Sequence, residues 1–229
     1  MDAYVLLGGP KEQWPYNLKQ RFCDAKSKGD LLIGVDRGAL FLLQLGITPD
    51  LAIGDFDSLR NQELSLIENR ISDIRYSVPK KDWTDSELML KIAFEDYKLD
   101  NVRIFGATGG RIDHFLINLF TVLNPDIRSY ANHIILEDCQ NEIIYRLAGS
   151  HKIKNLPEFY YFGVTCLGPV KNLKIQGALY NLNSYSGNYL RSFTSNEFLP
   201  GTAGCQISLD EGIIAIIYSK DLNRFDNLN

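Results

Sequence analysis

Short apolar runs alternate with helix-like segments through the first 124 residues, and this alternation limits what the chain can fold into. Four of the five runs end at glycine or aspartate, and we predict the runs to be strands over residues 4–7, 31–35, 51–55, 75–78 and 101–105. The segments between them predict helices over residues 18–26, 38–45, 62–69, 85–97 and 112–123. Short apolar strands that alternate with helices form a parallel sheet covered by helices on both faces.

The pattern changes after Pro125. From there the sequence carries short β-like runs with glycine or asparagine turns between them, and no amphipathic helix interrupts them. The runs cover residues 133–136, 142–145, 160–166, 173–175, 206–209 and 213–218. This pattern predicts an antiparallel sandwich or barrel. We therefore expect an α/β domain over residues 1–128, followed by an all-β domain, an antiparallel β-sandwich, over residues 129–229, with the boundary near 124–132.

The composition argues against several classes of protein. With 229 residues and 45% hydrophobic content the chain can bury a real core, and its net charge of −4 argues against a general binder of nucleic acid or anionic membranes. The four cysteines are widely scattered, which is typical of reduced thiols. No apolar stretch approaches the ~20 residues of a membrane span, and the start of the chain lacks a basic targeting segment. We therefore expect a soluble cytoplasmic protein that binds neither nucleic acid nor membrane.

Two aspartates follow the third predicted strand, in the segment Ile53-Gly54-Asp55-Phe56-Asp57-Ser58. Side chains at i and i+2 of an extended segment point the same way, with Cα atoms roughly 6–7 Å apart. That arrangement suits two acids that share one hard cation such as Mg²⁺. The alternative is a turn in which the carboxylates of Asp55 and Asp57 accept hydrogen bonds from nearby backbone amides. Asp36 ends the second predicted strand, and so it falls at the same carboxyl edge of the sheet, where ligands of such sheets bind.

A further acidic segment, Lys81-Asp82-Trp83-Thr84-Asp85-Ser86-Glu87, precedes the fourth predicted helix. Thr84 and Glu87 match a capping box, and Asp85 in the first turn suits the helix dipole. This structural role explains much of the segment. It does not explain why Asp82 and Asp85 fall at the same edge of the sheet as the other acids.

The segment Gly106-Ala107-Thr108-Gly109-Gly110-Arg111-Ile112-Asp113-His114 joins the fifth predicted strand to a helix. Glycines at such a junction expose backbone N–H groups at the positive end of the helix, which favours anion binding. A cation such as Arg111 in the first turn is unfavourable there unless a phosphate is bound. Asp113 lies two residues further on, so the two side chains should not face each other along the helix, and Asp113 either compensates the dipole or orients Arg111. His114 is more typical of a helix surface or core than of a base.

Several familiar motifs are absent from the sequence. It contains no Walker motif, no dinucleotide-binding G-x-G-x-x-G, no G-x-S-x-G and no H-E-x-x-H. What remains is a set of aspartates that faces a phosphate-binding helix terminus. This combination predicts phosphoryl or pyrophosphoryl transfer, or the hydrolysis of a phosphate ester.

Four blocks of the sequence resemble the thiamine pyrophosphokinase family, in the family's order. They are Val35-Asp36-Arg37-Gly38-Ala39, Pro49-Asp50 with residues 53–58, Thr84-Asp85, and residues 106–114. Gly177-Ala178-Leu179-Tyr180 and Ser195-Asn196-Glu197-Phe198 fit the family's second domain more loosely, and Arg37 and Ala178 depart from the residues that are frequent in it. The resemblance implies a catalytic α/β domain that binds ATP and magnesium, followed by a β-sandwich domain that binds thiamine and dimerises. It implies transfer of the pyrophosphoryl group of Mg-ATP to the thiamine hydroxyl, which releases AMP, in a homodimer with the thiamine site at its interface.

The resemblance also implies roles for individual residues. The magnesium ligands would be Asp55, Asp57 and Asp85. The residues at the ATP site would be Asp36, Thr84, Gly109, Gly110 and Arg111, and those at thiamine would be Tyr180, Ser195 and Asn196. Catalysis would rest on Asp55, Asp57, Asp85, Arg111 and Asp113, with Asp85 or Asp113 as candidate general base.

Two other functions stay open on the sequence. A related group of pyrophosphokinases acts on a hydroxymethylpterin and carries similar acidic and glycine motifs. A nucleotide-binding regulator without catalytic activity would keep the phosphate site, although it would need fewer carboxylates than Asp36, Asp55, Asp57 and Asp85 supply. Release of AMP from Mg-ATP in the presence of thiamine distinguishes the three.

Overall fold

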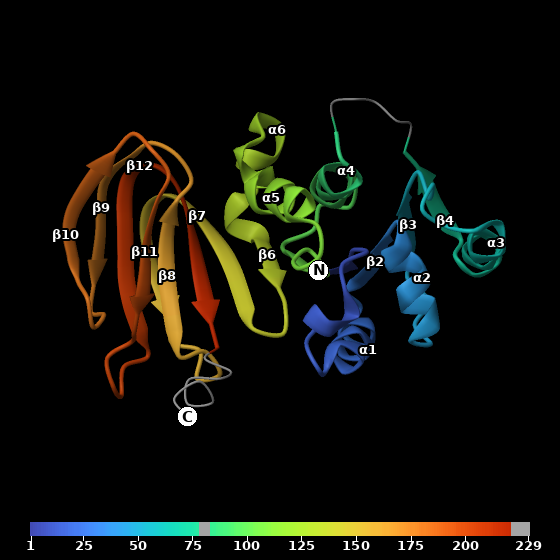
Figure 1. Ribbon diagram of the computed structural model, residues 1–229, viewed down its shortest axis with the longest axis horizontal. Helices are drawn as coiled ribbons and strands as arrows, with labels where there is room; N and C mark the ends of the chain where they lie inside the picture. The colour runs from blue at the N-terminus through green and yellow to red at the C-terminus, as the bar shows by residue number, and fades with distance from the viewer. Residues whose placement is uncertain (78–82, 221–229) are drawn as a thin grey trace. The chain divides into compact units, whose positions relative to one another are not determined.

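The computed structural model of the protein describes residues 1–77 and 83–220 (Figure 1). The chain divides into two compact units, of which the first is Met1–Cys139 and the second begins at Gln140. The first combines helices with strands, and the second is built from strands. None of the helices in the described ranges has the length and apolar character needed to span a membrane.

A parallel sheet forms the centre of the first unit. Its strands are β1 (Ala3–Leu6), β2 (Leu31–Val35), β3 (Leu51–Gly54), β4 (Asp73–Tyr76), β5 (Val102–Phe105) and β6 (Ile134–Glu137). They lie in the order β6-β5-β1-β2-β3-β4, and each neighbouring pair is parallel. The predicted parallel sheet is therefore confirmed. β4 begins before its predicted start, and Val78, its predicted end, lies outside the described residues.

Helices connect these strands and cover the sheet. They are α1 (Leu18–Lys28), α2 (Arg37–Gln44), α3 (Asn61–Arg70), α4 (Asp85–Lys91), α5 (Ile112–Phe120) and α6 (Pro125–Arg128). The helices predicted over 85–97 and 112–123 each change their hydrogen-bond pattern before they end. α4 continues as a π-helical turn over Ile92–Asp96, and α5 continues as a 3-10 turn over Thr121–Leu123.

Apolar side chains from strands and helices form a core under α1 and α2. Leu6, Leu32 and Phe105 of the sheet are fully buried, and they belong to one cluster with Phe22 of α1 and Leu42 of α2. Full burial of each such side chain is worth roughly 1.5–3 kcal/mol. A second cluster joins α2 and α3 to β3. The ends of the central strands are therefore held in place, and the loops that leave them start from fixed points.

One predicted strand belongs to a different sheet from the one expected. The sequence pattern assigns residues 133–136 to the C-terminal β region, and this assignment is wrong, because β6 pairs in parallel with β5, with Val102 opposite Ile134. The segment before β6 holds only the short α6 and a 3-10 turn over Ala131–His133, which are too short to show an amphipathic period. The first unit accordingly extends to Cys139, past the boundary expected near 124–132.

The second unit consists of antiparallel strands, as predicted. They are β7 (Asn141–Lys154), β8 (Tyr161–Cys166), β9 (Val170–Gln176), β10 (Leu182–Gly187), β11 (Arg191–Asn196) and β12 (Gly204–Ser219). One side of β12 pairs with β7, while its other side pairs first with β9 and then with β8. The outer strands β10 and β11 pair with β9 and β8 respectively.

Two details of the second unit differ from the predicted pattern. The runs over 206–209 and 213–218 are parts of one long strand, β12, whose register with β7 shifts between Leu209 and Ile213. β10 and β11 are not among the predicted strands, because their sequences are mostly polar. Their side chains are largely exposed, so no apolar alternation marks them.

Candidate active site

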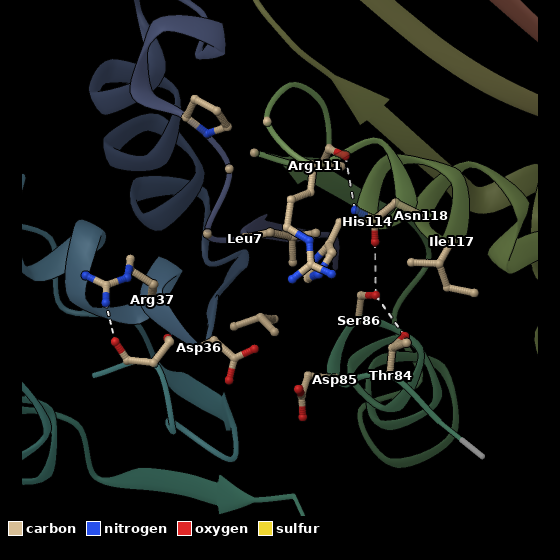
Figure 2. A pocket seen from close by; sticks show the side chains of 18 of the residues that line it. Leu7, Asp36, Arg37, Thr84, Asp85, Ser86, Arg111, His114, Ile117 and Asn118 are labelled. Atoms are coloured by element: carbon tan, nitrogen blue, oxygen red, sulfur yellow. Dashed lines mark hydrogen bonds between the residues drawn. The ribbon is translucent and has the colours of Figure 1, made fainter. Parts of the chain in front are cut away.

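The order of the strands creates a crevice at the carboxyl edge of the parallel sheet. The chain builds outward from β1 through β2, β3 and β4, and it then crosses back to place β5 on the other side of β1. Ligands of open α/β sheets bind at such a switch in strand order. A cavity of about 780 Å³ lies in the first unit at this edge, as Figure 2 shows. The predicted site residues on its walls are Asp36, Asp55, Asp57, Thr84, Asp85, Gly109, Gly110 and Arg111.

Three carboxylates meet in this cavity. Asp36 follows β2, Asp55 follows β3 and Asp85 is the first residue of α4. Each offers a carboxylate oxygen, and these oxygens lie within 4.8 Å of one another. Figure 2 shows Asp36 and Asp85 at the same side of the cavity. Three converging carboxylates form an oxygen-rich site of the kind that hard divalent cations prefer.

Unusual backbone conformations aim the first two of these acids. Asp36 and Phe56 both have positive φ, at 47° and 56°, which is unfavourable for residues other than glycine. The Phe56 side chain is buried and packs edge-on against Tyr76, with ring centroids 5.6 Å apart, so it anchors the turn that carries Asp55. Gly54 leaves room for the neighbouring acid, because a Cβ there would lie 1.9 Å from Oδ1 of Asp36. Strain of this kind is typical of functional sites.

The electrostatics around Asp36 favour the binding of a cation. Burial and the nearby carboxylates of Asp85 and Asp55 raise the pKa of Asp36 to about 7. Its Oδ1 atom is buried and has no hydrogen-bond partner among the described residues. A cation placed among the three carboxylates would satisfy that oxygen and relieve their mutual repulsion. The donor set therefore fits Mg²⁺.

Asp57 lies outside this cluster. It is exposed on the wall of the same cavity, and its backbone N–H donates to Oδ1 of Asp55 over 3.0 Å. The carboxylate of Asp55 thus accepts a backbone N–H, as in the turn that we expected as the alternative to a metal site. The structure brings Asp36 together with Asp55 and Asp85, whereas the resemblance points to Asp57 as the third ligand. Asp82, which the sequence also places at this edge, lies outside the described residues.

Thr84 has the structural role that the sequence predicts, and it also lines the cavity. Its hydroxyl accepts the Glu87 N–H, and the Glu87 carboxylate accepts the Thr84 N–H at 3.0 Å, so the capping box is formed. Glu87 is buried and also accepts a hydrogen bond from the side chain of Asn124. These contacts fix the start of α4, where Asp85 lies.

The glycine segments after β1 and β5 contact each other, and both line the cavity. The N–H of Gly9 donates to the carbonyl of Gly106, and a Cβ on Gly9 would lie only 2.3 Å from that carbonyl oxygen. Gly109 and Gly110 have φ of 76° and 68°, which glycine adopts without cost. The turn that the sequence predicts before α5 is therefore present, and it lines the cavity next to the N-terminus of that helix.

Arg111 and Asp113 form an ion pair, contrary to the prediction from helical spacing. Nε and Nη2 of Arg111 donate to the two carboxylate oxygens of Asp113, at 3.1 and 2.6 Å. The prediction is wrong because Arg111 is the N-cap, with extended backbone, rather than a residue of the first turn. The pair lowers the pKa of Asp113 to about 2. In Figure 2 the Arg111 side chain points into the cavity, toward Asp36 and Asp85, so Asp113 orients it.

A chain of hydrogen bonds that the sequence analysis did not identify connects the glycine segment to Thr84 (Figure 2). The side-chain amide of Asn118 on α5 donates to the carbonyl of Ala107 over 3.1 Å, and its oxygen accepts from Ser86 over 3.0 Å. The Ser86 hydroxyl in turn lies 3.1 Å from that of Thr84. Asn118 is a lone amide on an otherwise apolar stretch of helix, and this contrast is the signal that could have revealed it.

A buried pair also holds the glycine segment from below. The hydroxyl of Thr108 donates to Oδ2 of Asp138 over 2.8 Å, and both side chains are buried. Asp138 directly follows β6, the strand that the sequence pattern assigns to the other sheet. Its contact with the site could not be predicted for that reason.

The residues expected to contact thiamine lie in the second unit. The Tyr180 side chain is 63% exposed, and Ser195 is exposed with φ of 59°. Asn196 differs from both, since it is buried and its amide bonds to the backbone of Tyr180. The structure thus brings Tyr180 and Asn196 together.

Comparison with known proteins gives consistent matches for both units. The model of the thiamin pyrophosphokinase catalytic domain matches residues 22–135, and that of the thiamin pyrophosphokinase vitamin B1 binding domain matches residues 150–214. A thiamine pyrophosphokinase of Bacillus subtilis is 34% identical over 221 residues, which are 95% of this chain and 98% of that protein.

Solved structures agree with these matches. A thiamin pyrophosphokinase family protein from Enterococcus faecalis superposes with a TM-score of 0.87 at 34% identity, over 96% of this chain and 100% of that one. The structure of a thiamine pyrophosphokinase from Bacillus subtilis has a TM-score of 0.79 at 31% identity, over 97% and 100% of the two chains. The present chain therefore belongs to the thiamin pyrophosphokinase family.

Proposed function

We propose that this chain is a thiamine pyrophosphokinase, which transfers the pyrophosphoryl group of Mg-ATP to the hydroxyl of thiamine and yields thiamine diphosphate and AMP. The observation that carries the proposal is the convergence of three carboxylates, a glycine turn and Arg111 on one cavity. The match of the second unit to a vitamin B1 binding domain supports thiamine as the acceptor.

We propose that Asp36, Asp55 and Asp85 hold Mg²⁺, with Asp57 close enough on the cavity wall to contact a water or phosphate of the same complex. When bound, the ion neutralises phosphate charge that would otherwise oppose attack by the alcohol. The carboxylates contribute fixed positions and charge, and they form no covalent bond with the substrate.

The phosphates would bind at the glycine turn before α5. Gly109 and Gly110 lie beside the N-terminus of α5, where backbone N–H groups favour anions. Arg111 offers two donors to phosphate oxygens, and Asp113 keeps its guanidinium in place. In addition, the hydroxyl of Thr84 lines the cavity at the end of the Asn118 chain of hydrogen bonds.

The thiamine hydroxyl must lose a proton when it attacks. Asp113 is a poor acceptor for it, because both of its carboxylate oxygens bond to Arg111 and its pKa is held at about 2. Of the two candidate bases, we therefore favour Asp85, which lines the cavity.

In the second unit, we propose that the exposed ring of Tyr180 stacks on an aromatic ring of thiamine, and that the exposed hydroxyl of Ser195 bonds to the aminopyrimidine. A thiazolium cation gains roughly 0.5–2 kcal/mol from an aromatic face. We also propose a homodimer with the thiamine site at its interface. Exposed apolar side chains of both units support it: Ile112, Leu116 and Ile117 on α5, and Tyr189 and Leu190 before β11.

The test is the formation of AMP from Mg-ATP with thiamine as acceptor. We expect AMP and thiamine diphosphate in equal amounts, and no AMP when a hydroxymethylpterin replaces thiamine. AMP release with the pterin alone would identify a pterin pyrophosphokinase. Binding of ATP without AMP from either acceptor would identify a nucleotide-binding regulator. When aspartates of the site are substituted in this assay, Asp126→Asn is the control variant, because Asp126 is an exposed acid on α6.

A further inference from the structure

The side-chain amide of Asn196 is almost fully used inside the second unit. Its Oδ1 accepts the backbone N–H of Tyr180 over 3.0 Å and that of Glu197 over 2.9 Å. Its Nδ2 donates to the carbonyl of Tyr180 over 2.8 Å. An asparagine amide has two acceptor and two donor positions, so a single N–H remains for any other partner. The residue is only 4% exposed, which leaves little of it within reach of a substrate.

A β-bulge in β11 turns Asn196 toward Tyr180. In the pairing of β11 with β8, Phe193 is opposite Val164 but Asn196 is opposite Phe162, so β11 carries one extra residue. Ser195 lies at this position with φ of 59°, a left-handed conformation that costs free energy in a serine. Bulges commonly redirect a side chain in this way. Without the extra residue, the alternation along the strand would point residue 196 to the other face.

The backbone beside Tyr180 is held by the two residues that follow β11. The N–H of Leu179 donates to the carbonyl of Glu197 over 2.9 Å, and Ala178 forms an isolated β-bridge with Phe198. The N–H and the carbonyl of Tyr180 bond to the side-chain amide of Asn196 instead of to the backbone of a neighbouring strand. The N–H and the carbonyl of Tyr180 are therefore both held, while the residue remains 63% exposed.

We infer that Asn196 is a positioning residue for the acceptor site, which acts by fixing the backbone from which the Tyr180 ring projects rather than by bonding to the substrate. The inference deepens the proposed function and rests on it, because it takes the ring of Tyr180 as the surface on which thiamine stacks. On this inference, the bulge at Ser195 serves to direct the Asn196 side-chain amide toward the backbone of Tyr180.

Amide hydrogen exchange of the full chain tests the structural part of the inference and needs no substrate. Asn196→Ala should speed exchange of the Tyr180 and Glu197 amides by at least about tenfold, since both lose their acceptor. Thr194→Ala, at an exposed position two residues earlier in β11, is the matched control and should leave both amides protected. Unchanged protection of the Tyr180 amide in Asn196→Ala would overturn the inference.

Steady-state kinetics test the functional part. Asn196→Ala should raise the KM for thiamine about tenfold, with the KM for ATP unchanged. In a Tyr180→Ala background the same substitution should change the thiamine KM by less than about twofold, because its effect is already lost. Effects that multiply instead would show that Asn196 contacts thiamine directly and would overturn the inference.

A second variant covers the case in which Asn196→Ala does not fold. Asn196→Asp keeps the shape and the oxygen that accepts the two backbone N–H groups. It replaces the NH2 group by a carboxylate oxygen that cannot donate to the Tyr180 carbonyl, and it should give the same pattern of coupling to Tyr180→Ala. If the wild-type chain releases no AMP with thiamine, the proposed function fails, whereas the exchange result still decides whether Asn196 fixes Tyr180.

Discussion

Asp36 occupies a position that is unfavourable in two respects. Its backbone has a positive φ, which residues other than glycine rarely adopt, and its carboxylate is partly buried beside Asp55 and Asp85. Neither feature helps the metal-free fold. Residues of this kind are concentrated at functional sites, where a bound partner offsets the cost. Asp36 is therefore as central to the carboxylate cluster as Asp55 and Asp85.

The raised pKa of Asp36 gives the metal-free protein a stability that depends on pH. Because the folded pKa of about 7 exceeds the ordinary value of 3.8, this group contributes stability that is fully present below 3.8 and lost as the pH rises through about 7. The Tm of the metal-free chain should therefore fall between about pH 4 and about pH 7, and Asp36→Asn should flatten that slope. Thermal unfolding in the presence of a chelator measures it. Equal slopes in both proteins would contradict the assigned environment of Asp36.

Asp55→Asn should lower turnover at least about a hundredfold, because the stabilisation of phosphate charge by a metal is worth several kcal/mol. The fold should persist, since one of three adjacent negative charges is removed. Rates at saturating Mg²⁺ measure the effect, with Asp126→Asn as control. We expect a smaller loss in Asp57→Asn, because Asp57 lies outside the carboxylate cluster. Near-normal activity in Asp55→Asn would contradict the metal site.

Arg111→Ala should raise the KM for ATP about tenfold through the loss of two charge-assisted donors to phosphate. The Tm of the protein without ATP should not change, since the pair with Asp113 is exposed and such pairs contribute little. Arg70→Ala, an exposed arginine on α3, is the control. A loss of Tm with unchanged affinity for ATP would instead make Arg111 a structural residue.

At the level of single residues, the sequence was informative wherever chemistry follows directly from strand ends. The acids after β2 and β3 and the glycines after β5 could be placed at one edge because parallel strands share their carboxyl ends. The contact of Arg111 with Asp113 could not, because it depends on where α5 begins, and helix ends are fixed by local hydrogen bonds rather than by periodicity.

The elements around the cavity are connected through polar side chains. Asn118 bonds α5 to the glycine segment and to Ser86 of α4, so the glycine turn before α5 and the start of α4, where Asp85 lies, are connected. The sequence marks Asn118 only as a lone amide on an apolar stretch of helix, which does not say which groups it contacts. The polar outer strands β10 and β11 escaped prediction for a related reason: strands are recognised by apolar alternation, and these have little.

Asn118→Ala should raise the KM for ATP at least roughly fivefold, since it removes two hydrogen bonds and each is worth about 1 kcal/mol. Ser86→Ala should have a smaller effect, and the double variant should be no worse than Asn118→Ala alone, because both act through one chain of bonds. Initial rates at varied ATP measure this. A strictly multiplicative double variant would contradict the connection.

For the whole molecule, the central question is whether one active site draws on two chains. Mixing Asp55→Asn chains with Tyr180→Ala chains should restore activity if the carboxylate cluster of one chain works with Tyr180 of its partner. Random exchange in a dimer would give about a quarter of the wild-type rate, because half of the dimers would hold one intact site of two. An inactive mixture, with subunit exchange demonstrated by labelled chains, would contradict the shared site.

The central position of β1 in the sheet also determines how much of the chain must be synthesised before the site can form. One edge of β1 pairs with β2, but the other must wait for β5, where Val102 pairs with Ala3. A nascent chain that ends before β5 therefore has neither the second half of the sheet nor the glycine turn that follows it. Closing so long a loop is slow in comparison with local pairing. ATP would bind only after the sheet is complete. It can therefore stabilise finished chains, but it cannot promote the folding of chains that end before β5.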